Sequence, residues 1–339
     1  MRRLLLLTAI FATVTTYGCA PASKPKPQQP LAAKLTPRSK QPPAPPPVRA
    51  VTISPEQVAS ATAELRAGLK SSDGLIRAHT IEAMRQSTPA VFEKEIIAAL
   101  DDPAPIARTA AALAVGELKL AGGYPALQKL VSDDDNFVQI AVRFALHRLG
   151  NTRLSRDLEL FVQSDNARIR GMTAMVLGML EEPSAIKLLR PMQGDRDAIV
   201  RLQVAEALWR LGQQQGLANL AAAAVSAYPD DQMVAFIALA QPRDRRIIEH
   251  VRSGLTADYE EARLVAARAM GMLGSDAGYT IATTGLKSVD PRKRTLASLA
   301  LGAIGRADAV DALAPLLKDA NADVRVATAG AILQLVNRK

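Results

Sequence analysis

Residues that could carry catalysis or bind a metal are few in this chain of 339 residues. It has three histidines, His79, His147 and His250, and one cysteine, Cys19. No His-Glu dipeptide occurs, and Glu249 beside His250 is a single reversed pair. A zinc or two-metal site needs several converging ligands, and neither a Gly-rich phosphate loop nor a nucleophile with a paired base is present. The sequence therefore predicts no metal, no cofactor and no enzymatic activity.

The distribution of charge argues against a nucleic-acid partner. The chain carries 42 Lys and Arg against 33 Asp and Glu, a formal net charge of +9. Eight of the basic residues and none of the acidic ones fall in residues 1–50, which leaves 34 against 33 in the remainder. Proteins that bind nucleic acid without a specific motif use a basic face and stacking aromatics. A nearly neutral remainder with one tryptophan provides neither.

The single cysteine lies in a sequence typical of exported proteins. Arg2 and Arg3 precede an apolar run over residues 4–14, and Gly18 then precedes Cys19. A charged start, a short apolar stretch and a small residue before the cleavage site are typical of a signal peptide. The run is too short to span a bilayer. We expect a signal peptide over residues 1–18.

The end of this segment resembles the lipobox of bacterial lipoproteins, in which a small residue precedes a lipidated cysteine. The resemblance implies lipidation of Cys19 and a lipid anchor in the membrane. Thr16 and Tyr17 depart from the usual residues, and an ordinary signal peptide with an incidental cysteine is the alternative. Ala20 and Pro21 lack the aspartate that retains such proteins in the inner membrane. We therefore expect an outer-membrane lipoprotein that faces the periplasm.

Residues 19–52 have the composition of a linker. Ten prolines, five Lys or Arg and no acidic or aromatic residue lie between Pro21 and Pro47. Such a composition cannot bury a core and favours an extended chain. The folded domain is predicted to span residues 53–339. Ser54 is its first helix cap, because proline follows at the first helical position and Gln57 stands where a capping box needs it.

The folded domain consists of one motif repeated at an interval of 31 residues without an insertion. Seven of its nine anchor positions are arginine and two are glutamine: Arg77, Arg108, Gln139, Arg170, Arg201, Gln232, Arg263, Arg294 and Arg325. Apolar residues at offsets +3, +7 and +10 have helical periodicity, and a second apolar stripe follows a Gly or polar turn. Each copy is therefore a helical hairpin. We predict an all-α fold, a right-handed α-solenoid of about nine 31-residue hairpins with the anchor helices on its inner face.

The repeat resembles the HEAT-like repeats of phycobilisome lyases over about residues 54–339. Four residues before the anchor stands an Asp or Asn in six copies, which we expect to cap the anchor helix. The anchor arginines are expected to reach an acidic residue of the neighbouring repeat or a turn carbonyl. Because this ladder recurs in every copy, its predicted role is structural. The resemblance also implies an alternative function, a lyase- or hydroxylase-type enzyme.

Offsets +2, +5 and +9 lie opposite the core stripe and should form the exposed concave face. In the middle copies they carry apolar and arginine side chains, which suggests a partner-binding ridge beside Gly178. The alternative is that these side chains are harmless and that the tryptophan packs on the next copy. The candidate residues are Phe144, Arg148, Met172, Met175, Met179, Trp209 and Arg210.

The sixth copy departs from the repeat, because Gln232 replaces the anchor arginine and Pro242 occupies a core position. We expect a shortened inner helix there. Taken together, these features predict a non-enzymatic scaffold or adaptor at the cell envelope. Its partner would be a protein or peptide bound on the concave face.

Overall fold

A computed structural model describes residues 44–337, and every regular element in this range is helical. The predicted all-α solenoid of about nine hairpins is confirmed. The predicted signal peptide, residues 1–18, and the predicted lipidation site Cys19 lie outside the described residues. Within residues 44–337, no helix has the length and apolar character needed to cross a bilayer.

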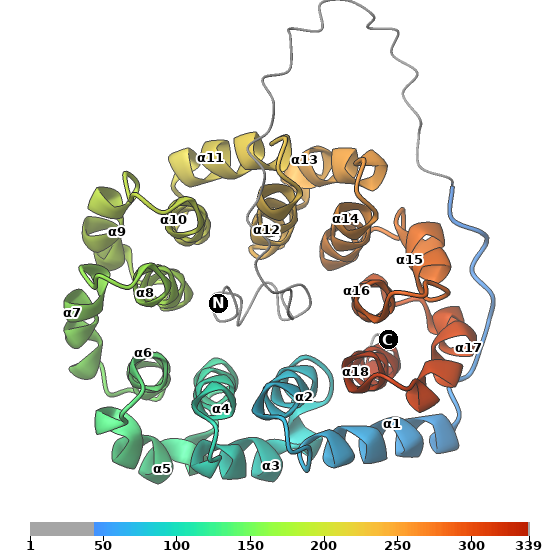
Figure 1. Cartoon of the computed structure of the whole chain (residues 1–339), viewed down its shortest axis with the longest axis horizontal. Helices are drawn as coiled ribbons and strands as arrows, with labels where there is room; N and C mark the ends of the chain where they lie inside the picture. Colours follow the sequence, from blue (N-terminus) through green and yellow to red (C-terminus); the bar gives the residue numbers. More distant parts are fainter. Residues whose placement is uncertain (1–43, 338–339) are drawn as a thin grey trace, which may run out of the picture.

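The helices form two concentric layers around a closed ring (Figure 1). The anchor residues lie on the inner helices, as predicted. The inner layer consists of α2 (Gly74–Gln86), α4 (Pro105–Leu118), α6 (Asn136–Arg148), α8 (Ala167–Met179), α10 (Ala198–Arg210), α12 (Pro229–Ala240), α14 (Glu260–Met272), α16 (Pro291–Ile304) and α18 (Ala322–Asn337).

The outer helices are mostly shorter than the inner ones. They are α1 (Pro55–Gly68), α3 (Glu93–Ala98), α5 (Tyr124–Lys129), α7 (Glu159–Val162), α9 (Ile186–Met192), α11 (Gln214–Ala224), α13 (Ile248–Arg252), α15 (Tyr279–Gly285) and α17 (Val310–Leu313). Most are flanked by single 3-10 turns: Pro89–Val91, Ala99–Asp101, Ala121–Gly123, Leu130–Ser132, Leu154–Leu158, Pro183–Ala185, Arg245–Ile247, Ser253–Thr256, Ala307–Ala309 and Ala314–Lys318.

The last hairpin packs against the first, which closes the ring (Figure 1). At this seam His79 Nδ1 lies 2.5 Å from the Asp323 carboxylate, and Arg325 donates to Glu64 at 2.8 Å. Asn337 donates to the Ser87 carbonyl at 2.7 Å. Closure was not predicted from the sequence. Identical repeats add identical rotations, and about 40° per hairpin brings nine of them back to the start.

The beginnings of the inner helices follow the sequence prediction. Asp73, Asp135, Asn166, Asp197 and Asp290 each accept a backbone N–H of the first turn. In the copies that carry Ala104, Tyr228 or Tyr259 there, no side-chain cap forms. Ser54 and Gln57 form the predicted capping box of α1. A side-chain cap satisfies backbone donors that the first turn of a helix leaves unpaired.

The inner helix of the sixth copy is only one residue shorter than most others, with 12 residues in α12 against 13 in α10 and α14. Helix α12 ends at Ala240, eight residues after its anchor, before Pro242. Gln232 still donates to the Ser226 carbonyl at 2.7 Å, but it cannot replace the ion pair of an arginine. The local loss of hydrogen-exchange protection that this predicts stays a prediction.

Residues 44–52, the described end of the predicted linker, run along the outer rim of the ring (Figure 1). Arg306 donates to the carbonyls of Pro46 and Pro47 at 2.7 and 3.1 Å. Arg49 binds Asp308 through its backbone N–H at 3.1 Å and Asp311 through its guanidinium at 2.9 Å. The chain is therefore attached to the last two repeats before it enters α1.

Candidate functional site

The inner helices run in the same direction, so the ring has two chemically different ends. One end, here the N-terminal face, holds the first turns of these helices and the turns that precede them. The other, the C-terminal face, holds their last turns. The helix dipole favours acidic side chains near helix N-termini and basic ones near C-termini.

The N-terminal face carries the predicted ladder. All nine anchor side chains donate to the backbone carbonyl six residues earlier, at 2.7 to 2.9 Å. Four arginines also bind, through two nitrogens, the aspartate of the next copy. These pairs are Arg77 with Asp102, Arg108 with Asp133, Arg170 with Asp195 and Arg294 with Asp319.

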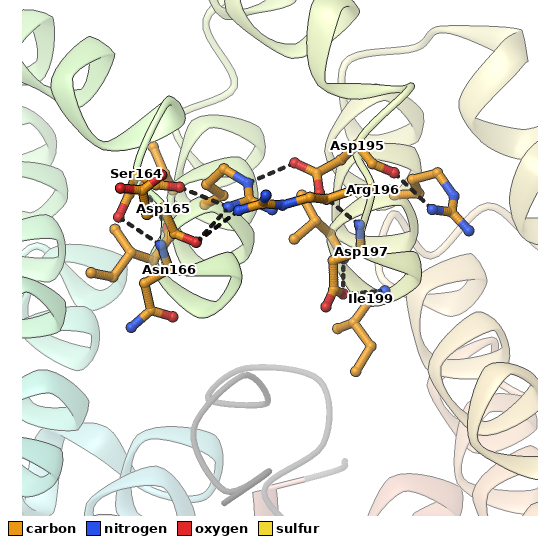
Figure 2. Close-up of polar contacts among 12 residues, drawn as sticks. Ser164, Asp165, Asn166, Asp195, Arg196, Asp197 and Ile199 are labelled. Atoms are coloured by element: carbon orange, nitrogen blue, oxygen red, sulfur yellow. Dashed lines mark hydrogen bonds and ion pairs between the residues drawn. The ribbon is translucent and has the colours of Figure 1, made fainter.

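Each ladder aspartate is held on two sides. Asp195 accepts the Arg170 guanidinium at 2.7 and 2.8 Å and the Asp197 backbone N–H at 2.9 Å (Figure 2). The hydrogen bond from Arg170 keeps the pKa of Asp195 below its usual value, against the opposing effect of burial. These groups satisfy one another and recur around the ring, which supports the predicted structural role.

The C-terminal face holds a cavity of about 550 Å³ inside the ring. Every inner helix, or the residue just after it, contributes to its wall. Most of the lining residues stand at offsets +5, +9 and +11 from their anchors. The charged ones are Arg85, Arg148, Arg210, Arg243, Arg268, Glu117 and Glu181. We call this space the arginine cavity.

The arginines of this cavity differ in their partners. Arg85 forms ion pairs with Glu82 and Glu117, and Arg210 binds Glu206 at 3.1 Å. Among the described residues, no carboxylate forms an ion pair with the other three arginines, at positions 148, 243 and 268.

Two of these arginines are poorly satisfied in the interior of the ring. The Arg148 Nε is buried and has no hydrogen-bond partner among the described residues. Arg268 makes one long hydrogen bond, 3.5 Å to the Gln86 side chain. Burial lowers the pKa of the Arg268 guanidinium, while the charge of Glu82 opposes this effect. Both residues are partly buried, and a partly buried cation without an ion pair is costly, so an anionic ligand would reduce that cost.

Glu117, the acid that pairs with Arg85, also lies in an environment of low polarity. Burial raises the pKa of Glu117 above its usual value, and the charge of Arg85 only partly offsets this. For Arg85 the charges of Glu82 and Glu117 outweigh burial, so its pKa is raised. An added carboxylate would therefore meet arginines in an environment where charge interactions are stronger than in water.

The histidines do not form a site. His79 lies at the seam, whereas His147 Nδ1 lies 3.0 Å from the Ser155 hydroxyl and its Nε2 3.4 Å from Glu182. His250 lies on outer helix α13, and its side chain is exposed. Within residues 44–337, no group of three His, Cys, Asp or Glu side chains is placed to hold a metal ion.

The predicted exposure of the apolar ridge was wrong. Phe144, Met172, Met175, Met179 and Trp209 are all at most 7% exposed. The helical offsets do point away from the outer layer, as predicted. Because the ring is closed, that direction leads into an enclosed lumen or against a neighbouring inner helix, and not to an open concave face.

Trp209 and Gly178 show why no apolar gap exists. The Trp209 Nε1 donates to the Leu239 carbonyl of α12 at 3.3 Å, so the indole packs on the next copy. A Cβ on Gly178 would lie 2.6 Å from the Ala207 Cα. The glycine is therefore a place where α8 and α10 approach closely, and no partner side chain fits there.

Four of the predicted site residues do meet at one place. Phe144, Arg148, Met179 and Arg210 line the arginine cavity, whereas Met172, Met175 and Trp209 do not. Sequence reasoning missed Arg85, Arg243, Arg268 and Glu117. Offsets +5 and +9 would have found Arg268 and Glu117 if read around all nine copies, but only a closed ring brings distant copies together.

Comparison with known proteins agrees with the repeat analysis. The family model for HEAT repeats matches residues 62–147, 154–240 and 248–334. No curated protein matches the chain. Solved structures that match include the complex of CpcE and CpcF of phycocyanin lyase from Nostoc. The sequence identity is 19% and the TM-score 0.43, and the match covers 70% of this chain and 95% of that one. Human deoxyhypusine hydroxylase matches with 20% identity, coverage of 73% and 98%, and a TM-score of 0.40. With three matched segments that together cover more than half of its length, the chain belongs to the family of HEAT-repeat proteins.

Proposed function

We propose that this protein is a non-enzymatic scaffold that binds an acidic segment of a protein partner in the arginine cavity. The observation that carries the proposal is the unpaired state of Arg148 and Arg268 inside the ring. Carboxylates are the protein groups that pair with guanidinium most strongly, through parallel hydrogen bonds. A segment with two or more Asp or Glu residues would supply the missing counter-ions.

The proposed place of action is the cell envelope. The sequence supports export and a lipid anchor at Cys19, followed by a linker that leads to the folded ring. The described end of that linker contacts Arg306, which follows the last turn of α16. The linker therefore joins the ring near its C-terminal face. Mass spectrometry of the mature N-terminus tests the anchor, and an unmodified residue other than Cys19 there would contradict it.

Site-specific photo-cross-linking in cells tests the partner. A benzoylphenylalanine replaces Gln241, which lines the cavity, and in a control it replaces Leu160, which is 76% exposed on outer helix α7. We expect cross-linked peptides rich in Asp and Glu from position 241 only. The double variant Arg148→Ala/Arg268→Ala should lose them.

Two results would contradict this proposal. One is recovery of the same peptides from position 160 or from the double variant. The other is turnover of a small molecule by the purified protein, which would instead favour the lyase- or hydroxylase-type alternative.

A further inference from the structure

The N-terminal face carries an apolar patch that the ring does not bury. Val225, Tyr228, Tyr259 and Val289 are 73%, 68%, 53% and 97% exposed. They precede the inner helices α12, α14 and α16, which are neighbours in the ring (Figure 1). Elsewhere in residues 44–337 only three other large hydrophobic side chains are exposed, and none belongs to this face. We call these four residues the tyrosine patch.

Two of these side chains replace residues that would stabilise the fold. Tyr228 and Tyr259 occupy the position at which most other copies have a capping Asp or Asn, and neither provides a side-chain cap. Loss of a cap destabilises a helix by about 1 kcal/mol. The Arg–Asp ladder is also interrupted here, because Ala257 and Ser288 stand where it would need an aspartate. Exposed apolar groups that weaken the fold are typical of an interaction surface.

Carboxylates follow the two tyrosines of the patch, whereas Arg292 and Lys293 follow Val289. The first turn of α12 contains Asp230 and Asp231, and that of α14 contains Glu260 and Glu261. Lys293 of α16 binds Glu260 at 2.6 Å and lies 3.8 Å from Glu261. No described cation pairs with the two aspartates of α12, so the Tyr228 end of the patch keeps its negative charge.

We propose that the tyrosine patch is a second docking surface, for a basic segment of a protein partner that also carries proline or other apolar side chains. Tyrosine rings accept prolines and, through their faces, Lys or Arg cations. The neighbouring carboxylates complement the same cations and steer their approach. This surface is distinct from the arginine cavity, because it lies on the opposite face and has the opposite charge.

The attachment of the linker favours a separate partner. Arg306, which holds Pro46 and Pro47, follows the last turn of α16, whereas the tyrosine patch precedes the first turns. The full helix length therefore separates the patch from the point at which the linker joins the ring. A ring tethered through this linker would present the patch away from its tether.

Binding of a defined peptide to the full-length chain tests the proposal. The probe is a fluorescein-labelled peptide of four Lys-Pro-Leu repeats, measured by fluorescence polarisation, with four Glu-Pro-Leu repeats as control. We expect binding of the basic peptide only. The variant Tyr228→Asn/Tyr259→Asn should weaken it roughly tenfold, because aromatic anchors dominate such contacts. Asparagine can cap both helices, so the thermal unfolding midpoint of this variant should be equal to or higher than that of wild type.

A variant with fewer negative charges provides a second test in the same binding experiment. Asp230→Asn/Glu261→Gln should weaken binding roughly threefold and reduce its dependence on salt. Equal affinity in wild type and the tyrosine variant would overturn the proposal. It would also be overturned if replacing the five basic residues between positions 21 and 43 with Gln strengthened binding of the probe. That result would show that the chain's own segment occupies the patch.

Discussion

The two faces of the ring are built from the same nine inner helices, yet the arginines on the two faces differ in their hydrogen-bond and ion-pair partners. On the N-terminal face each anchor arginine reaches a turn carbonyl, and four also bind an aspartate of the next copy. On the C-terminal face Arg148 and Arg268 lie inside the ring without an ion pair to a described carboxylate. Features that repeat in this protein hold hairpins together. The departures from the repeat mark the surfaces that we propose for binding.

The largest expected effect comes from breaking the ladder. Arg170→Ala should lower the free energy of unfolding by about 3 kcal/mol, because it leaves the buried Asp195 carboxylate without its partner. Arg201→Ala is the matched control, since Arg201 bonds only a carbonyl, at 2.7 Å. It should cost about 1 kcal/mol or less. Urea denaturation followed by circular dichroism measures both, and equal losses would contradict the ladder's role.

Close packing of the inner helices predicts a smaller loss. Gly178→Ala places a Cβ 2.6 Å from the Ala207 backbone and should destabilise the ring by about 2 kcal/mol. Gly194→Ala is the control, because a Cβ there meets nothing within 4 Å. Urea denaturation followed by circular dichroism compares the two. A stable Gly178→Ala variant would indicate a wider gap between α8 and α10.

Arginines with and without an ion pair should contribute differently to stability. Arg268→Met should leave the free energy of unfolding unchanged or raise it by up to about 1 kcal/mol, because a partly buried cation without an ion pair is removed. Arg85→Met should instead be destabilising, since it leaves Glu82 and Glu117 unpaired. A comparable loss in both variants would show that Arg268 supports the fold.

Acid should destabilise the N-terminal face by protonating the ladder aspartates. The ladder aspartates Asp102, Asp133, Asp195 and Asp319 have lowered pKa values in the folded state. Their stabilising contribution is therefore complete above the unfolded pKa near 3.8 and is lost as the pH falls through the lower folded values. The raised pKa of Glu117 has the opposite sign, so its protonation relieves a cost. Stability between pH 6 and pH 2 should fall less steeply in Arg170→Ala than in wild type.

The sequence predicted most of the fold because each repeat is locally encoded. The 31-residue spacing, the capping residues and the turn glycines, such as Gly150 and Gly212 with φ of +100° and +75°, all act within one hairpin or between neighbours. Closure depends on the sum of nine small rotations, which no single motif contains. The candidate site was therefore only half predicted. Arg148 and Arg210 follow from the helical offset, but the approach of Arg268 to Gln86 exists only in the closed ring.

Binding of a defined acidic peptide tests whether the arginine cavity is a ligand site. Isothermal titration of acetylated tetraglutamate amide into the full-length protein should show one site per ring, with tetraglutamine amide as the neutral control. The double variant Arg148→Ala/Arg268→Ala should weaken binding at least tenfold, since each charged hydrogen bond is worth roughly 1.5–3 kcal/mol. Equal affinity of wild type and the double variant for tetraglutamate would contradict the assignment of the arginine cavity as the ligand site.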